Sequence, residues 1–272
     1  MGLEPTASGA TIQRSNQLSY VRHIFITEVI IAHMWQKTKC WRHWFGAQAV
    51  ELLEVGVRGE LDAGGLCTMG SMIVDLSIPI RQNMPVYPGD PEVIVELADT
   101  FEQSGYEGHN VTIGTHAGTH IDAPLHMIEG GDDLSAFPLE TFVGRGKLVE
   151  GFSLEALQAA GVQAGDIVLF RSGASVRFEE ESYFTDYPVL DAATVEALVA
   201  AKVKLVGIDT CSADNEEGFP NHKALLGAGI PIIENVTNLQ VLQDKQFRVY
   251  ALPLSLAQDA APARVVAEVV GA

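Results

Sequence analysis

Positively charged residues are scarce in this sequence. Its 272 residues include 17 Lys and Arg against 35 Asp and Glu, which gives a formal net charge of −18 at pH 7. A protein with such an acidic excess repels phosphate backbones and anionic lipid head groups. The composition therefore argues against nucleic acid and membranes as partners, and it predicts a small-molecule substrate.

Cysteine is also rare, and the apolar run at residues 25–32 is short. The three cysteines are odd in number and widely spaced, which is not the pattern of a disulfide framework, so we expect a reducing cytoplasm. Glu28 interrupts the apolar run, which is too short and too polar to span a bilayer and lacks the small-residue cleavage site of a signal peptide. An apolar fraction of 47% is nevertheless ample for a globular core.

Residues 1 to about 70 differ in composition from the rest. All three tryptophans and two of the three cysteines lie in this segment, whereas the acidic excess belongs to the remainder of the chain. We interpret residues 1–70 as an N-terminal extension, either appended or mis-assigned, with short amphipathic helices near 19–35 and 46–55. The functional domain is then expected over residues 71–272.

From Ile73 onward, the sequence alternates between expected strands and expected helices. Apolar patterning predicts strands at 73–80, 92–97, 110–115, 146–150, 167–171, 204–209 and 230–235. Helices are expected at 154–160, 192–201 and 219–226, and Ser153 and Asp191 are the expected N-caps of the first two. Strand, helix and strand in this order indicate a βαβ unit with a parallel, buried component, and hence an α/β fold.

Three histidines and one aspartate lie within residues 116–126, HAGTHIDAPLH, although the whole chain has only eight histidines. These side chains are ligands of divalent transition metals. On a straight strand, His116 and His120 would stand roughly 13 Å apart, too far to share one ion. We therefore expect a bend at Gly118. His120 and Asp122 would then share one face of an extended segment, with His126 in a loop beyond them.

The alternative interpretation is a set of separate histidines, each hydrogen-bonded in the core or exposed. Burying several unpaired imidazoles with a carboxylate would be costly, which favours a metal site. His222 and Glu234 fall at the ends of expected elements, where α/β proteins gather functional groups. Taken alone, however, they are better explained as a surface or capping residue and a solvated strand end.

Residues 116–126 resemble the signature of the cyclase-like metal-dependent hydrolase family, which includes bacterial kynurenine formamidase and isatin hydrolase. Residues 219–222 (FPNH) and 234–239 (ENVTNL) resemble two further motifs of that family, and the resemblance covers about 73–270. It implies a single α/β domain with a mixed sheet or barrel-like β core flanked by helices, of the swivelling β/β/α type.

The resemblance also implies a two-metal centre. His116, His120 and Asp122 would hold one ion, and Asp122 would bridge to a second ion held by His222 and Glu234. Nitrogen and oxygen ligands without a thiolate favour Zn²⁺ or Mn²⁺. Ions in such sites activate water and polarise a carbonyl, so the implied function is hydrolysis of small amides, as in an arylformamidase.

His126 is left over as a ligand and is the implied general base and general acid, since an imidazole titrates near neutrality. Tyr87 occupies the place of the tryptophan that lines the formamidase substrate pocket, although packing against the neighbouring prolines would explain it equally well. Two other functions remain open: ring opening of a cyclic amide, as in isatin hydrolase, and a non-catalytic metal-binding scaffold, against which His126 speaks. We also expect a homodimer or a higher homo-oligomer.

Overall fold

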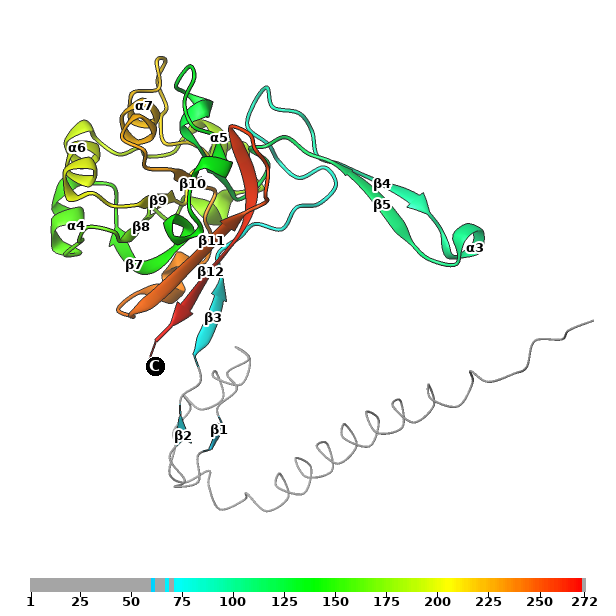
Figure 1. Cartoon of the computed structure of the whole chain (residues 1–272), viewed down its shortest axis with the longest axis horizontal. Coiled ribbons are helices and arrows are strands. Elements are labelled where there is room, and N and C mark those ends of the chain that lie inside the picture. The colour runs from blue at the N-terminus through cyan, green and yellow to red at the C-terminus, as the bar shows by residue number, and fades with distance from the viewer. Residues whose placement is uncertain (1–59, 62–66, 69–70, 271–272) are drawn as a thin grey trace, which may run out of the picture. The chain divides into compact units, whose positions relative to one another are not determined.

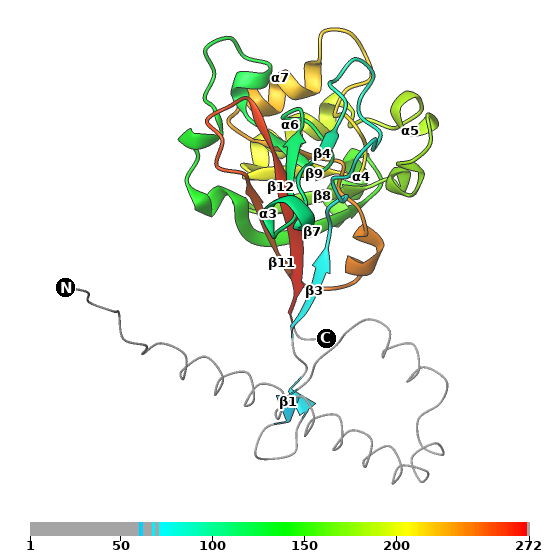
Figure 2. The same cartoon turned by 90° about the vertical axis from the view of Figure 1, so that its right-hand side faces the viewer.

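The computed structural model describes residues 60–61, 67–68 and 71–270 (Figures 1 and 2). The amphipathic helices expected near 19–35 and 46–55, and most of the expected extension, lie outside the described residues. Two short strands, β1 (Glu60–Leu61) and β2 (Cys67–Thr68), pair with each other in antiparallel orientation. No helix among the described residues is long and apolar enough to cross a membrane.

Seven strands close into a mixed β-barrel, in the order β11, β7, β8, β9, β10, β6 and β12, with β11 pairing back onto β12. The pairs among β7, β8, β9 and β10 are parallel, whereas β6, β11 and β12 run antiparallel to their neighbours. An eighth strand, β3, extends the sheet beside β12. The bounds are β3 Met72–Asp75, β6 His120–Asp122, β7 Val143–Glu150, β8 Ile167–Arg171, β9 Leu205–Ile208, β10 Ile232–Glu234, β11 Phe247–Pro253 and β12 Ala260–Val269. This architecture confirms the expected α/β fold with a barrel-like core.

Alternate residues of the barrel strands face two different apolar layers, as the two-residue period of a strand requires. On β8, Ile167 and Leu169 belong to the core inside the barrel, whereas Val168 and Phe170 pack in an outer layer beneath helices. The covering helices are α4 (Leu154–Ala159), α6 (Ala192–Ala201) and α7 (Pro220–Gly227). The parallel pairing of β8 with β9, joined through α6, confirms the expected βαβ unit.

The expected helix starts are confirmed in detail. The Ser153 side chain accepts a hydrogen bond from the Ala156 backbone N–H, and the Asp191 side chain accepts one from the Thr194 N–H at 2.7 Å. Each cap satisfies a backbone donor that has no partner within its own helix.

The strands expected at 92–97 and 110–115 are observed as β4 (Ile94–Asp99) and β5 (Gly108–Thr112), but they do not join the barrel. They pair only with each other and run away from it in Figure 1, with the short helix α3 (Phe101–Ser104) between them. Large side chains such as Leu97 and Val111 are more than half exposed. The remaining short elements are α5 (Ser182–Thr185) and 3₁₀ turns at Pro124–His126, Leu134–Ala136, Leu139–Phe142, Ala174–Arg177 and Leu239–Leu242.

Candidate metal centre

The candidate site lies on the outer wall of the barrel, where β6 pairs antiparallel with β10. His120 stands opposite Glu234 in this pairing. Ile121 and Ile233, the neighbours of those two residues, both point into the barrel core. Strand alternation therefore turns His120, Asp122 and Glu234 outward, onto one common face.

A bend before β6 brings His116 to the same place. Gly118 has a φ of +63°, a conformation that glycine adopts at little cost, so the expected bend is confirmed. Asn235, which follows β10, stabilises the bend through two hydrogen bonds. Its side-chain Nδ2 donates to the Gly118 carbonyl at 2.9 Å, and its own carbonyl accepts from the Thr119 hydroxyl at 2.6 Å.

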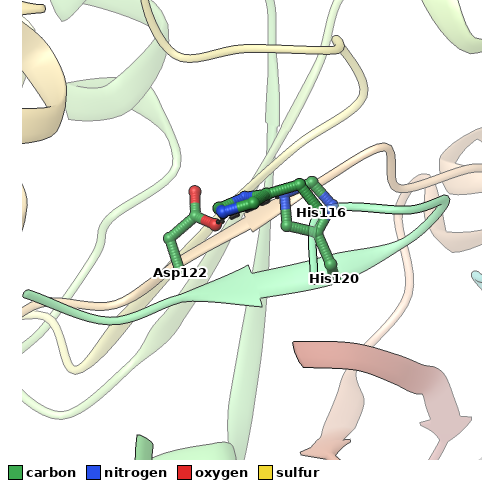
Figure 3. A group of neighbouring side chains, drawn as sticks. All are labelled: His116, His120 and Asp122. Atoms are coloured by element: carbon green, nitrogen blue, oxygen red, sulfur yellow. Dashed lines mark ion pairs between the residues drawn. The ribbon is translucent and has the colours of Figure 1, made fainter. Parts of the chain in front are cut away.

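The first group of ligand atoms comprises His116, His120 and Asp122 (Figure 3). Asp122 Oδ1 lies 3.0 Å from His116 Nδ1 and 3.3 Å from His120 Nε2. Two ligand atoms bound tetrahedrally at about 2.0–2.1 Å from one ion stand roughly 3.3 Å apart. Both distances to Asp122 Oδ1 therefore match those of atoms that share one metal ion, and all three ligand atoms lie within 4.8 Å of one another.

A second group faces the other oxygen of Asp122. His222 Nε2, on α7, lies 3.7 Å from Asp122 Oδ2 and 3.1 Å from Glu234 Oε1. Glu234 also reaches toward the first group, with Oε2 3.5 Å from His120 Nε2. Asp122 thus has one oxygen facing each group.

The polar atoms at the centre of the two groups lie at ion-pair distances from one another but make no hydrogen bond within the described part of the chain. His120 Nε2 and both carboxylate oxygens of Asp122 are buried without a hydrogen bond. Leaving such atoms unpaired costs about 1–3 kcal/mol each, and more for a charged group. A divalent cation bound between them removes that cost, so the donor set fits a metal centre.

The outward ring nitrogens of the histidines are held by acceptors. His120 Nδ1 lies 2.8 Å from the Gly118 carbonyl, and His222 Nδ1 lies 2.7 Å from Asp214 Oδ2. His116 Nε2 lies 3.0 Å from Asp259 Oδ2. Metal-binding histidines are usually oriented in this way, because fixing the proton on one nitrogen leaves the other free to bind the ion.

Sequence reasoning missed Asp214 and Asp259. Asp214 also accepts the backbone N–H groups of Asn221 and His222 at the start of α7, both at 2.9 Å. A carboxylate a few residues before a helix is a weak sequence signal for such a cap. Asp259 precedes β12 and is far from the histidine motif in sequence, so nothing in the sequence marked it as part of this site.

The carboxylates determine the charge state of the metal-free site. Burial opposes the charged form of His116, but its close contacts with the carboxylates of Asp122 and Asp259 raise its pKa to about 9. Burial acts the same way on His222, and Asp122, Asp214 and Glu234 raise its pKa to about 12. The neighbouring imidazoles in turn hold the pKa of buried Asp122 well below its usual range. Both histidines therefore carry protons at neutral pH until a cation displaces them.

His126 lies beside both groups: its ring nitrogens lie within 4.8 Å of ligand atoms of Asp122 and His222 and of His116 and Asp259. It lies in the 3₁₀ turn after β6, and its ring centroid is 4.2 Å from that of His116 and 5.8 Å from that of His222. Its Nδ1 is 3.6 Å from Asp259 Oδ2, beyond hydrogen-bond distance. Burial lowers its pKa from the usual value, so the ring is neutral at pH 7.

A cavity of about 200 Å³ opens over the histidines and carboxylates. Four aromatic side chains line it, namely Tyr87, Phe178, Phe184 and Phe219. Tyr87, for which the family resemblance implies a place in the substrate pocket, is 39% exposed and is one of these lining residues. Cys211 also lines the cavity, but burial raises the pKa of its thiol to about 12, which leaves it un-ionised and poorly nucleophilic at neutral pH.

Known proteins resemble this chain in both sequence and fold. Residues 74–215 match the model of the Cyclase family, described as "Putative cyclase". A kynurenine formamidase of Erythrobacter litoralis is 32% identical over 191 residues, 68% of this chain and 87% of that protein. A solved structure described as a potential metal-dependent hydrolase with cyclase activity is 31% identical, with a TM-score of 0.64, over 75% of this chain and 100% of that chain. Isatin hydrolase A from Labrenzia aggregata, solved with bound benzyl benzoate, shares the fold at 23% identity and a TM-score of 0.66, over 74% of this chain and 94% of that chain.

Proposed function

The chain belongs to the cyclase family, and on that basis we propose that it is a metal-dependent hydrolase of small amides, similar to an arylformamidase. Asp122 is the observation that carries the proposal. Its two oxygens are buried without a hydrogen-bond partner in the described chain, and each faces a different set of imidazole nitrogens. A buried carboxylate between two sets of imidazole nitrogens would hold two cations at once.

His116 and His120 would hold one ion with Asp122, and His222 and Glu234 would hold a second ion with the same carboxylate. We propose two ions, Zn²⁺ or Mn²⁺, because the donors are nitrogen and oxygen with no thiolate among them. Two ions held this way would make water a stronger nucleophile at neutral pH and polarise the substrate carbonyl.

His126 would move the proton. With Nδ1 turned toward Asp259, its Nε2 is the atom available to the substrate. This nitrogen takes a proton from the water that attacks the carbonyl carbon, and it returns the proton to the leaving nitrogen as the carbon–nitrogen bond breaks. The products are a carboxylic acid and an amine, and no covalent enzyme intermediate forms. The lowered pKa of His126 suits the first step, because the ring must start neutral.

The cavity supports a small aromatic substrate. Its volume of about 200 Å³ lies below the range usual for drug-sized ligands, and Tyr87 and Phe219 are two of the aromatic side chains in its wall. A single-ring aryl amide therefore suits it, with the ring against the aromatic wall and the carbonyl toward His126. Formanilide and N-formylkynurenine are the first candidates, and isatin tests the cyclic-amide alternative.

The test is a hydrolysis assay on these three compounds. The protein is first stripped with a chelator and then reloaded with Zn²⁺ or Mn²⁺. We expect no turnover without metal, recovery on reloading, and a rate about 10²–10⁴-fold lower for His126→Ala with its metal retained. His109→Ala is the matched control, because His109 is exposed on β5 and outside the site.

Three outcomes would separate the alternatives. Full activity in the stripped protein would overturn metal dependence. Metal binding without turnover of any of the three amides would favour the non-catalytic scaffold. Loss of metal from His126→Ala to the same extent as from His120→Ala would make His126 a ligand rather than the acid and base.

We further propose that the enzyme works in the cytoplasm as a homodimer or higher homo-oligomer, with residues 1–70 as an extension of a catalytic domain at 71–272. The few scattered cysteines support a reducing compartment. The change of composition near Met69 supports the domain boundary.

A further inference from the structure

Asp259 is a carboxylate at the metal centre to which no role has yet been assigned. It immediately precedes β12, and the next residue, Ala260, pairs with Asp122 on β6. The Asp259 carbonyl also accepts the Ala123 backbone N–H at 2.8 Å. Backbone pairing therefore fixes Asp259 beside the metal-ligand strand, independently of its side chain.

The Asp259 carboxylate contacts the one proposed ligand that lies in a turn. Its Oδ2 is 3.0 Å from His116 Nε2, while the opposite ring nitrogen, Nδ1, is 3.0 Å from Asp122 Oδ1. An ionised carboxylate can only accept a hydrogen bond, so once a cation displaces the proton on Nδ1, the proton that remains on the imidazole stays on Nε2, toward Asp259. That arrangement leaves the lone pair of Nδ1 directed at the first group of ligand atoms.

The same oxygen lies close to His126. The Asp259 Oδ2 to His126 Nδ1 distance is 3.6 Å, and the rings of His126 and His116 are in contact with their centroids 4.2 Å apart. A His116 ring that lost its support would therefore no longer present a fixed surface to the ring of the proposed general base.

We propose that Asp259 is a positioning residue that fixes the ring of His116 for metal binding and, through that ring, the place of His126. The inference rests on the proposed metal centre, not on the identity of the amide. It also completes a pattern, because His120 and His222 already have acceptors in the Gly118 carbonyl and Asp214. Asp214 in addition caps α7, whereas the Asp259 side chain, within the described part of the chain, pairs with the histidines alone.

The test uses the full chain with two substitutions at Asp259. Asp259→Ala removes the acceptor, whereas Asp259→Asn keeps an acceptor oxygen of the same size and removes the charge. Gln258→Ala is the matched control, because its side chain is exposed and immediately precedes Asp259. Zn²⁺ affinity is measured by competition with a chelator, and the visible absorption spectrum of the Co²⁺-loaded protein reports the ligand geometry; neither measurement needs a substrate.

Loss of a residue that orients a metal ligand typically weakens metal binding by about 10–100-fold. We expect a loss in this range for Asp259→Ala with a changed Co²⁺ spectrum, a much smaller loss for Asp259→Asn, and none for Gln258→Ala. At saturating metal, Asp259→Ala should lower kcat and leave KM unchanged, since His126 is displaced while the aromatic wall is intact.

Two results would overturn the inference. One is wild-type Zn²⁺ affinity and spectrum in Asp259→Ala. The other is a loss of about 10–100-fold in Asp259→Asn, the range expected for Asp259→Ala, because charge rather than orientation would then explain it; this result can be read even if Asp259→Ala does not fold. Failure of the proposed amide hydrolysis would look different, since the metal measurements would follow the expected pattern while no tested amide was turned over.

Discussion

Metal binding by this protein should tighten steeply as the pH rises from 7 to 9. The perturbation is pH alone, and it acts through the two histidines whose pKa values are raised in the metal-free site. The neighbouring carboxylates raise that of His116 to about 9 and that of His222 to about 12, in both cases against the opposing effect of burial. Both rings are therefore protonated at pH 7, and each must lose a proton before its ring nitrogen can bind a cation.

The magnitude follows from these values. For His116, the difference of 9 − 7 = 2 pH units corresponds to a cost of about 3 kcal/mol at pH 7. Each proton released raises the apparent affinity about tenfold per pH unit. The overall constant for loading both groups should thus rise about 100-fold per unit below pH 9, where both histidines release protons. Above pH 9 it should rise about tenfold per unit, since only His222 then does so.

The same raised pKa values make the fold of the metal-free protein less stable as the pH rises. A raised pKa stabilises the folded state fully below the unfolded value of about 6.5, and this contribution is lost as the pH rises through the folded value. The stabilisation that His116 contributes to the folded state is therefore lost between about pH 6.5 and pH 9. The melting temperature of the stripped protein should fall over this window, while that of the loaded protein should fall less.

Calorimetric titration with Zn²⁺, repeated in buffers of different ionisation enthalpy, counts the protons released. We expect about two at pH 7.5, and about one fewer for His116→Gln. His109→Gln should leave the count unchanged, because its side chain is 42% exposed and outside the site. Zinc binding with no proton release between pH 7 and 8 would refute the reasoning, since it would mean that the carboxylates do not hold these histidines in their charged form.

Three further predictions can be checked with simpler measurements. Asp122→Ala should lose both ions by elemental analysis and lose activity with them, because its two oxygens face the two groups separately; retention of one ion would contradict the bridging role. Gly118→Ala should lower the free energy of unfolding in urea by roughly 1–3 kcal/mol, because φ is +63° and the new Cβ would lie 3.2 Å from Met84 Cε, so an unchanged midpoint would be the contrary result. A chain that begins at Met69 should fold and keep its activity, since every proposed ligand and the buried core of the described residues lie after it; an insoluble or inactive product with an intact metal site would place the extension in the functional protein.

The local features of this protein could be predicted from its sequence because their causes are local. The Ser153 and Asp191 caps and the strand Ile167–Arg171 each depend on a few adjacent residues, and all three are confirmed. The bend at Gly118 was equally accessible, because it follows from the distance that His116 and His120 must close.

Long-range features were less accessible. The barrel closes through the pairing of β11 with β12 and with β7, and the alternation within any one strand does not specify those partners. Alternation in β4 and β5 likewise predicted strands correctly but not that they would pair only with each other. Asp259 was missed for the same reason, since only the pairing of Ala260 with Asp122 brings it to the histidines.

The core and the metal centre are specified by the same alternation. Ile121 separates His120 from Asp122, and it packs inside the barrel together with Ile233, the neighbour of Glu234. A slip of one residue in the register would turn every side chain of a strand to the other face. Such a slip in β6 would expose Ile121 and bury the two ligands in an apolar core, where an unpaired charge is very costly. Burial of the two isoleucines therefore fixes the register that sets His120 opposite Glu234, so the apolar positions of the motif also contribute to the geometry of the metal centre.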